Sequence, residues 1–228
     1  FMESYGVPAF GMKDASLTAM FAMGQTNGIV IDAGTDTRVL PVQFGHGLHH
    51  VGSTFFGGDR FAMEERHLPD GNVLTLEAKH VDKYFCRATE EHIFICAGKK
   101  NPIFPGLANV FNRTMNAMNE VYDEDTLGAG FLSNVLLCGG SSRLTGMKDR
   151  LQRELDAVDG GRFKGRAIVK SGDDFIGENK NATHASYIGG TILLSVSDVF
   201  KKRWMVTKAE YQESGDRVFR KIYDVRLT

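Results

Sequence analysis

The sequence has few of the features that mark secreted, membrane-spanning or disulfide-stapled proteins. Its three cysteines, Cys86, Cys96 and Cys138, cannot form a closed set of disulfides, and they lack the CxxC spacing of a zinc ribbon. It contains no run of about 18 apolar residues, which a transmembrane helix would need. The first residues also lack the basic and apolar regions of a signal peptide. A reducing, intracellular compartment is therefore expected.

An excess of positive charge is also absent. The chain carries 27 Lys and Arg against 28 Asp and Glu, a net charge of −1, so composition gives no indication of direct nucleic-acid binding. Hydrophobic residues make up 42% and charged residues 24%, which excludes a disordered, collagen-like or coiled-coil chain. The length of 228 residues suffices for one domain or two small ones with a real core. The sequence opens at Phe1, as if cut from a longer chain.

Short apolar strands alternate with amphipathic helices along the chain, which predicts an α/β layer structure. A hairpin is expected from strands at 28–34 and 38–44, with Pro41 at an edge or a bulge. Two further strands are expected at 134–138 and 167–169. Helical spacing and end signals predict helices at 8–24, 107–118, 187–194 and from about Gly146 onward.

Two short motifs have the form of anion-binding loops. Asp32-Ala33-Gly34 ends a strand, where a glycine admits backbone N–H groups to an anion and a carboxylate can hold a metal ion. The stretch from Cys138 to Ser142 places two glycines between a strand and a helical segment. Each motif alone is more often a plain turn, and neither matches GxGxxG or the P-loop pattern.

Other candidates are weaker. The histidines His46, His49 and His50 have no carboxylate or thiol at ligand spacing, so a metal site is not expected. Cys138 has no neighbouring base to activate it, and a buried structural role is favoured. Met115 and Met118 fit a core stripe better than a binding groove, and Lys201-Lys202-Arg203 fits a solvated helix end.

Taken in order, several segments resemble the C-terminal two-thirds of the actin family. They are 28–34, which is similar to the second phosphate-binding hairpin, and LPDGNV at 68–73, LLCGGSSRLTG at 136–146, YIGGTIL at 187–193 and WMVTKAEYQESG at 204–215. The resemblance implies an actin-like, ribonuclease H-like lobe with a mixed sheet and flanking helices. Residues 1–60 and 101–228 would form the large lobe, and 61–100 a remnant of the small fourth subdomain. The N-terminal actin lobe would lie outside the chain.

Members of this family bind ATP or ADP with Mg²⁺ between two lobes. The resemblance assigns the nucleotide contacts, if they are retained, to Asp32, Gly34, Gly139, Gly140, Ser141, Arg143 and Leu144. Several departures make catalysis unexpected, and neither a cofactor nor a metal is expected. The water-positioning glutamine aligns with Ala15, its histidine partner falls near Thr37 or Arg38, and a nucleoside-contacting lysine aligns with Thr183. The hairpin is shortened, and the chain passes almost directly from Asp59 to Leu68, where the family has several helices.

The resemblance also suggests how the protein acts. In the family an apolar cleft receives partner helices, and here it would involve Phe21, Ala22, Gly24, Leu193 and Val196. The expected function is that of a divergent, non-catalytic structural subunit of a larger cytoskeletal or motor assembly. The expected location is the cytoplasm and cytoskeleton, including cilia, with the nucleus as the alternative. The partners would be other proteins rather than nucleic acid or membrane. The alternative function is an ATP-binding filament protein with slow ATP hydrolysis.

Overall fold

The computed structural model describes residues 2–56, 95–96, 99–100, 106–122, 129–196 and 204–221. The LPDGNV motif at 68–73 and the direct passage from Asp59 to Leu68 lie outside these residues. Of the expected remnant at 61–100, two short paired strands are described, β6 (Ile95–Cys96) and β7 (Lys99–Lys100).

The core of the molecule is a six-stranded mixed sheet. Its strands follow the order β4 (His46–Gly47), β3 (Asp36–Gln43), β2 (Gly28–Ala33), β8 (Val135–Cys138) and β9 (Val169–Lys170), and β5 (Ser53–Phe56) also pairs with β3. The β2–β8 and β8–β9 pairs are parallel, whereas β3 runs antiparallel to all its neighbours. The predicted hairpin is confirmed, and so is the mixed sheet with flanking helices.

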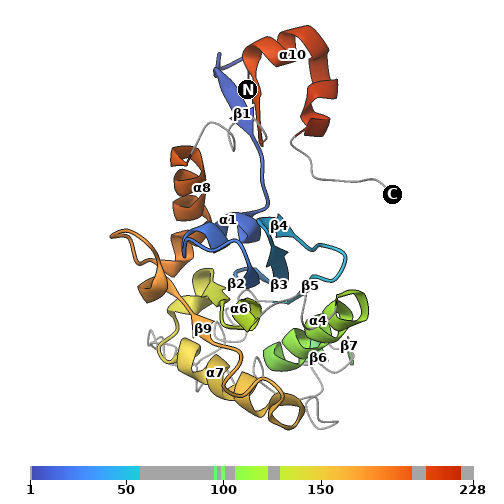
Figure 1. Cartoon of the computed structure of the whole chain (residues 1–228), viewed down its shortest axis with the longest axis vertical. Helices are drawn as coiled ribbons and strands as arrows, with labels where there is room; N and C mark the ends of the chain where they lie inside the picture. The colour runs from blue at the N-terminus through green and yellow to red at the C-terminus, as the bar shows by residue number, and fades with distance from the viewer. Residues whose placement is uncertain are drawn as a thin grey trace.

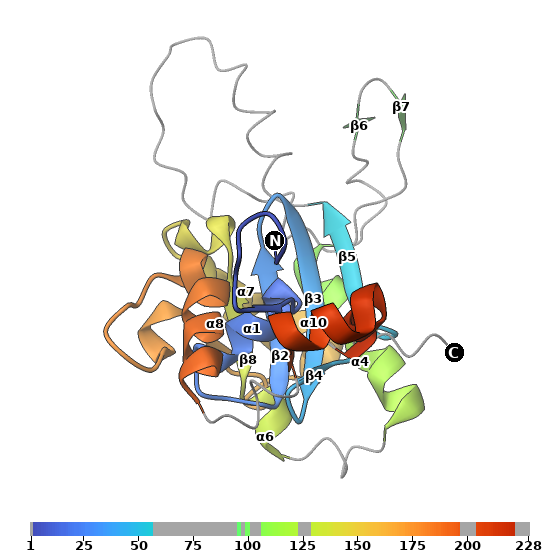
Figure 2. The same ribbon diagram turned by 90° about the horizontal axis from the view of Figure 1, so that it is seen from above.

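Helices cover both faces of the sheet (Figures 1 and 2). One face carries α1 (Ala15–Phe21) and α8 (Ala185–Ser195), and the other carries α4 (Leu107–Val121) and α7 (Met147–Ala157). Side chains of β2 alternate between these layers. Ile29, Ile31 and Ala33 belong to the core around α4 and α7, whereas Val30 belongs to the core around α1 and α8. Asp32 shares the parity of Val30 and so faces α1.

The helices predicted at 107–118, from Gly146 and at 187–194 are all present. The helix predicted at 8–24 is shorter, because α1 begins at Ala15. Residues Ala9–Gly11 instead form β1, which pairs antiparallel with β10 (Met205–Thr207). This pair, α10 (Lys208–Ser214) and the 3-10 segment Gly215–Lys221 form a small unit at the top of Figure 1 with its own apolar cluster around Met2 and Val206.

Proline 41 lies inside β3 rather than on an edge strand. Its carbonyl accepts a hydrogen bond from the Leu48 backbone N–H at 2.8 Å, which shows that its missing N–H would also point away from β2. On that side β4 pairs with residues 42–43 of β3 and β5 with residues 36–39. Pro41 therefore falls in the gap between two short strands, where no ladder bond is lost. No helix in the described part of the chain has the length and apolar character needed to cross a membrane.

Candidate nucleotide-side site and partner pocket

The two anion-type loops meet at one edge of the sheet. Asp32 of β2 is in register with Cys138 of β8 in a parallel pair, so both strands end side by side. A Cβ placed on Gly139 would lie 2.6 Å from Asp32 Oδ1 and 2.8 Å from the Ala33 carbonyl oxygen, and Gly139 has a φ of +88°. Only glycine fits this position. The two loops therefore touch directly at this edge.

The other residues expected to contact a nucleotide do not all lie at this edge. Gly34 follows Asp32 in the hairpin turn, and its N–H donates to the Asp36 carbonyl at 3.2 Å. Gly140, Ser141 and Arg143 lie in a 3-10 turn, Gly140–Arg143, directly after Gly139, and Arg143 is exposed. Leu144 packs against the core around α4 and α7. The structure thus brings Asp32, Gly34, Gly139 and the 3-10 turn to one edge, but Leu144 contributes to packing.

The carboxyl group of Asp32 lies in an unfavourable electrostatic environment. Burial raises its pKa above the ordinary value, and the negative charge of Asp14 raises it further, while the positive charge of Arg38 opposes both. Arg38 is the cross-strand partner of Asp32 in the hairpin, so both side chains emerge on the same face. A half-buried carboxylate whose pKa is raised by desolvation is typical of functional positions.

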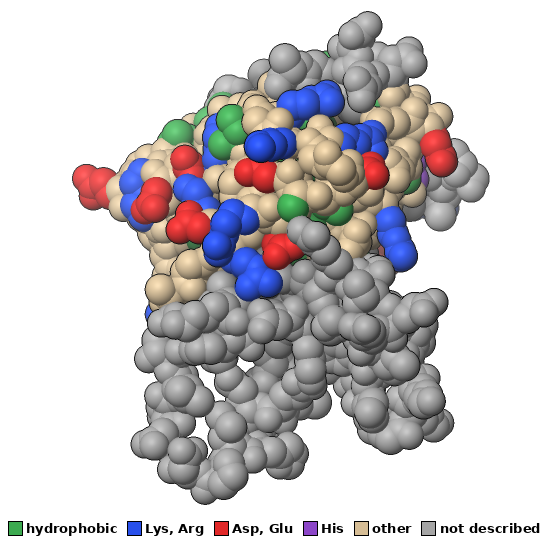
Figure 3. All heavy atoms as spheres, turned by 90° about the horizontal axis from the view of Figure 1, so that it is seen from below, with side chains coloured by type: hydrophobic (Ala, Val, Ile, Leu, Met, Phe, Trp, Pro, Cys, Tyr) green, Lys and Arg blue, Asp and Glu red, His purple; other side chains and the backbone are tan. Residues whose placement is uncertain are grey.

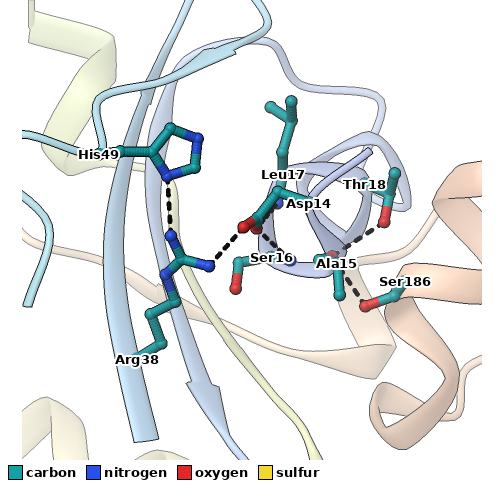
Figure 4. A network of polar contacts seen from close by, with 8 residues as sticks. All are labelled: Asp14, Ala15, Ser16, Leu17, Thr18, Arg38, His49 and Ser186. Atoms are coloured by element: carbon teal, nitrogen blue, oxygen red, sulfur yellow. Dashed lines mark hydrogen bonds and ion pairs between the residues drawn. The ribbon is translucent and has the colours of Figure 1, made fainter. Parts of the chain in front are cut away.

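A polar network next to Asp32 was not predicted from the sequence (Figure 4). Asp14 is the N-cap of α1, and its Oδ1 accepts the backbone N–H groups of Ser16 at 2.9 Å and Leu17 at 3.2 Å. Its Oδ2 forms an ion pair with Nη1 of Arg38. Nη2 of Arg38 lies 2.7 Å from Nδ1 of His49. One guanidinium thus joins the start of α1, strand β3 and the loop after β4.

Ala15 lies at the start of the same helix. Its carbonyl oxygen accepts hydrogen bonds from Oγ1 of Thr18 at 2.9 Å and from Oγ of Ser186 at 2.8 Å, and its side chain is a methyl group. A methyl group cannot orient a water molecule for attack. The side chain that reaches toward Asp32 from the hairpin is Arg38, which has no acceptor atom and stays protonated.

The weaker chemical candidates have structural roles. His49 contacts Arg38, and His50 lies against Tyr122 with ring centroids 6.3 Å apart. Among the described residues no group of three or more His, Cys, Asp and Glu could hold a metal ion. Cys138 is buried, and burial together with the nearby Asp32 raises the pKa of its thiol well above the ordinary range. We therefore expect this thiol to be unreactive in the folded state.

An apolar pocket of about 380 Å³ opens between α8, the segment leading into α1 and the residues around Trp204. Its described lining consists of Gly11, Met12, Lys13, Thr18, Tyr187, Gly190, Thr191, Leu193, Leu194, Trp204 and Met205. Met12, Tyr187 and Leu194 are exposed apolar side chains at this pocket. Nζ of Lys13 lies 4.8 Å from the ring centroid of Trp204.

This pocket differs in its lining from the cleft expected from the sequence. Leu193 is on its wall, but Phe21 and Ala22 are buried in the core, where the Phe21 ring lies 5.9 Å from the Trp204 ring. Gly24 faces Ile176, and Val196 is exposed beyond the end of α8. The buried α1 residues therefore support the pocket from behind. The sequence pattern does not identify Met12 and Lys13 as lining residues, because it predicts a continuous helix over 8–24.

Sequence comparisons agree with this fold. The sequence model of the family described as Actin matches residues 59–223. Actin-related protein 7 of Oryza sativa subsp. japonica is 30% identical over 273 residues, covering 96% of this chain and 69% of the relative. Putative actin-29 of Dictyostelium discoideum is 23% identical over 261 residues, covering 96% and 65%. Actin-like protein 7B of Homo sapiens is 25% identical over 264 residues, covering 93% and 58%.

The chain is thus an α/β protein with a mixed sheet and flanking helices, and it belongs to the actin family. It spans between 58% and 69% of the length of these three relatives. The alignment with the rice protein runs over 273 positions, more than the 228 residues of this chain, so that relative has internal residues without a counterpart here.

Proposed function

We propose that this actin-family chain is a non-catalytic structural subunit of a larger protein assembly. The observation that carries the proposal is the set of side chains beside Asp32. Ala15 offers only a methyl group, and Arg38 forms an ion pair with Asp14. Losing one oriented general acid or base typically costs a factor of about 10²–10⁴ in rate. A cytoskeletal or axonemal assembly is the proposed setting, with a nuclear one as the alternative.

The contact with the assembly is proposed to be the pocket around Trp204. Its lining is mostly apolar, and exposed apolar side chains at one site are typical of protein-interaction surfaces. Lys13 is the one residue of the described lining that carries a charge, so it favours a carboxylate on the partner. The proposed occupant is an amphipathic helix of another protein, with an apolar face and an acidic residue beside it.

The charges on another face agree with a protein partner. Figure 3 shows the face of the molecule around α7, where basic and acidic side chains are interspersed. Several of them are paired, as in Arg150–Glu154 at 3.0 Å and Lys148–Asp174 at 3.0 Å. A nucleic-acid surface would instead gather charge of one sign. This mixed pattern of charges supports the proposal that the partner is a protein rather than a nucleic acid.

The pocket can be tested with the protein's own fluorescence. The chain contains a single tryptophan, Trp204, and it lines the pocket, so its emission reports on that site alone. We expect a Trp-free synthetic amphipathic helix with Leu and Glu residues to shift this emission saturably. Gly190→Met should weaken binding at least about tenfold, because nothing lies within 4 Å of a Cβ at Gly190 and the new side chain would enter the pocket.

The matched control is Gly130→Met. Gly130 is also helical with open space around its Cβ, but it lies in α6 (Ala129–Leu132), outside the pocket lining. It should bind the peptide like the unchanged chain. Equal binding by both variants, or no saturable shift at all, would contradict the pocket proposal.

The catalytic side of the proposal has its own assay. The alternative function, an ATP-binding filament protein with slow hydrolysis, is favoured by the retained contact between Asp32 and Gly139. We expect no steady-state phosphate release from ATP by the purified protein above a protein-free blank. Turnover comparable to that of conventional actin would favour the alternative.

A further inference from the structure

The site next to Asp32 does not fit the divalent cation that accompanies nucleotides in this family. Mg²⁺ requires near-octahedral oxygen ligands, usually one or two carboxylates with waters and phosphates. Here Oδ1 of Asp14 accepts two backbone N–H groups, and its Oδ2 is paired with Arg38. Asp32 is the remaining carboxylate of this cluster, and Arg38, its cross-strand neighbour, places a positive charge beside it that would repel a divalent cation.

We infer that Arg38 replaces the divalent cation, so that the positive charge in this site is a side chain of the protein itself. Its guanidinium pairs with Asp14, reaches His49 and offsets the charge of Asp32 across the hairpin. The inference goes beyond the proposed subunit role and does not depend on the partner pocket.

Arg38 also connects segments that lie far apart in the sequence. Asp14 lies 24 residues before Arg38 and His49 lies 11 after it, so one side chain fastens three separate segments (Figure 4). A planar guanidinium has donors in several directions, so it can serve a carboxylate and an imidazole together. The side chains of Arg38 and Asp14 are 32% and 20% exposed, so the pair is partly shielded from solvent. A bridging metal ion is not needed to hold these segments.

The first test compares thermal unfolding of the whole chain in EDTA and in MgCl₂, each with and without ATP. A ligand that binds only the folded state raises the melting temperature by mass action. We expect the same melting temperature, within about 1 °C, in MgCl₂ and in EDTA at each ATP condition. An ATP-induced rise that is equal in EDTA agrees with the inference, because no metal is then needed. A rise that requires Mg²⁺ and is lost in Asp32→Asn overturns it.

The second test is a double-mutant cycle on the ion pair. Asp14→Asn removes the charge but keeps a good N-cap, and Arg38→Met removes the charge but keeps most of the side chain's length. Each single change should lower the melting temperature by about 2–4 °C, and the double variant should fall little further. Arg38→Lys should retain part of the stability, whereas Arg150→Met, in an ion pair on α7, is the control for losing any paired arginine.

These outcomes separate the inference from the proposed function. Additive effects of Asp14→Asn and Arg38→Met would show that the pair is not coupled and would overturn the inference. If Arg38→Met does not fold, the comparison of MgCl₂ with EDTA on the unchanged chain still decides. ATP turnover without any need for Mg²⁺ would refute the non-catalytic role but leave the inference standing. A Mg²⁺-dependent stabilisation without turnover would do the reverse.

Discussion

The adjacent glycines of α8, Gly189 and Gly190, should respond in opposite ways to the same substitution. A Cβ on Gly189 would lie 1.7 Å from the Thr18 carbonyl oxygen and 3.1 Å from the Ala22 backbone nitrogen, both in or at the end of α1. A Cβ on Gly190 would meet nothing within 4 Å. The first glycine therefore permits the α1–α8 contact, and the second lies on the open wall of the pocket.

The expected cost of Gly189→Ala follows from this contact. The obstacle is backbone rather than a flexible side chain, so the helices would have to separate by more than about 1 Å. Residues 16–21 of α1 are all buried, which leaves that helix little room to move. Overpacking of this kind costs about 1–3 kcal/mol or more, against a gain of about 1 kcal/mol in helix propensity. With a contact this short we expect a net loss of about 2 kcal/mol and a melting temperature lower by about 4–8 °C.

Gly190→Ala should keep only the gain in propensity. It should stabilise the protein by about 0.5–1 kcal/mol and raise the melting temperature by about 1–4 °C. Far-ultraviolet circular dichroism on both variants and the unchanged chain measures the two shifts under one set of conditions. Equal shifts in the two variants, or an unchanged melting temperature for Gly189→Ala, would refute the close approach of α1 and α8.

Three further predictions concern the edge of the sheet. Because the folded-state pKa of Asp32 is raised, its contribution to stability is present below the unfolded value of 3.8 and is lost as pH rises through the folded value. Asp32→Asn should therefore raise the melting temperature at pH 7, with a smaller gain toward pH 4; a lower melting temperature at pH 7 would contradict this. Gly139→Ala should cost at least about 2 kcal/mol in denaturant unfolding, because it combines strain at positive φ with a 2.6 Å contact, and wild-type stability would refute that contact. The thiol of Cys138 should resist alkylation until the chain unfolds, as followed by peptide mass spectrometry, and rapid labelling of the native protein would show that it is not buried.

The long amphipathic segments were predictable because their packing information is local. Met147, Leu151 and Leu155 recur at helical spacing, and all three are buried in α7. The segment before α1 was not predictable in this way. Pro8 is a sound helix-start signal, but residues 9–11 pair with Met205–Thr207 at the other end of the chain. A pairing over that separation overrides local propensity and leaves no sign within a short window.

The candidate site shows the same difference between contacts set by local sequence and contacts set by distant segments. The meeting of Asp32 with Gly139 could be expected, since the carboxyl ends of neighbouring parallel strands share one edge. The pairing of Asp32 with Arg38 could also have been obtained from the hairpin, by counting residues outward from its turn. The contacts of Arg38 with Asp14 and His49 could not, because they depend on where α1 starts and on a loop after a two-residue strand.

The side-chain alternation of β2 determines which helix lies beside the carboxylate of Asp32. A one-residue change of parity would turn this carboxylate into the apolar core around α4 and α7. In the observed register it lies instead on the side of α1, whose first turn presents the Asp14 carboxylate and a methyl group at Ala15. Substitutions at the start of α1 can therefore change the chemistry beside Asp32 without affecting the sheet. That separation explains how the strand-end contact between Asp32 and Gly139 can be kept while the side chains beside it change, and it makes Asp14 and Arg38 the positions at which the chemistry around Asp32 is tested.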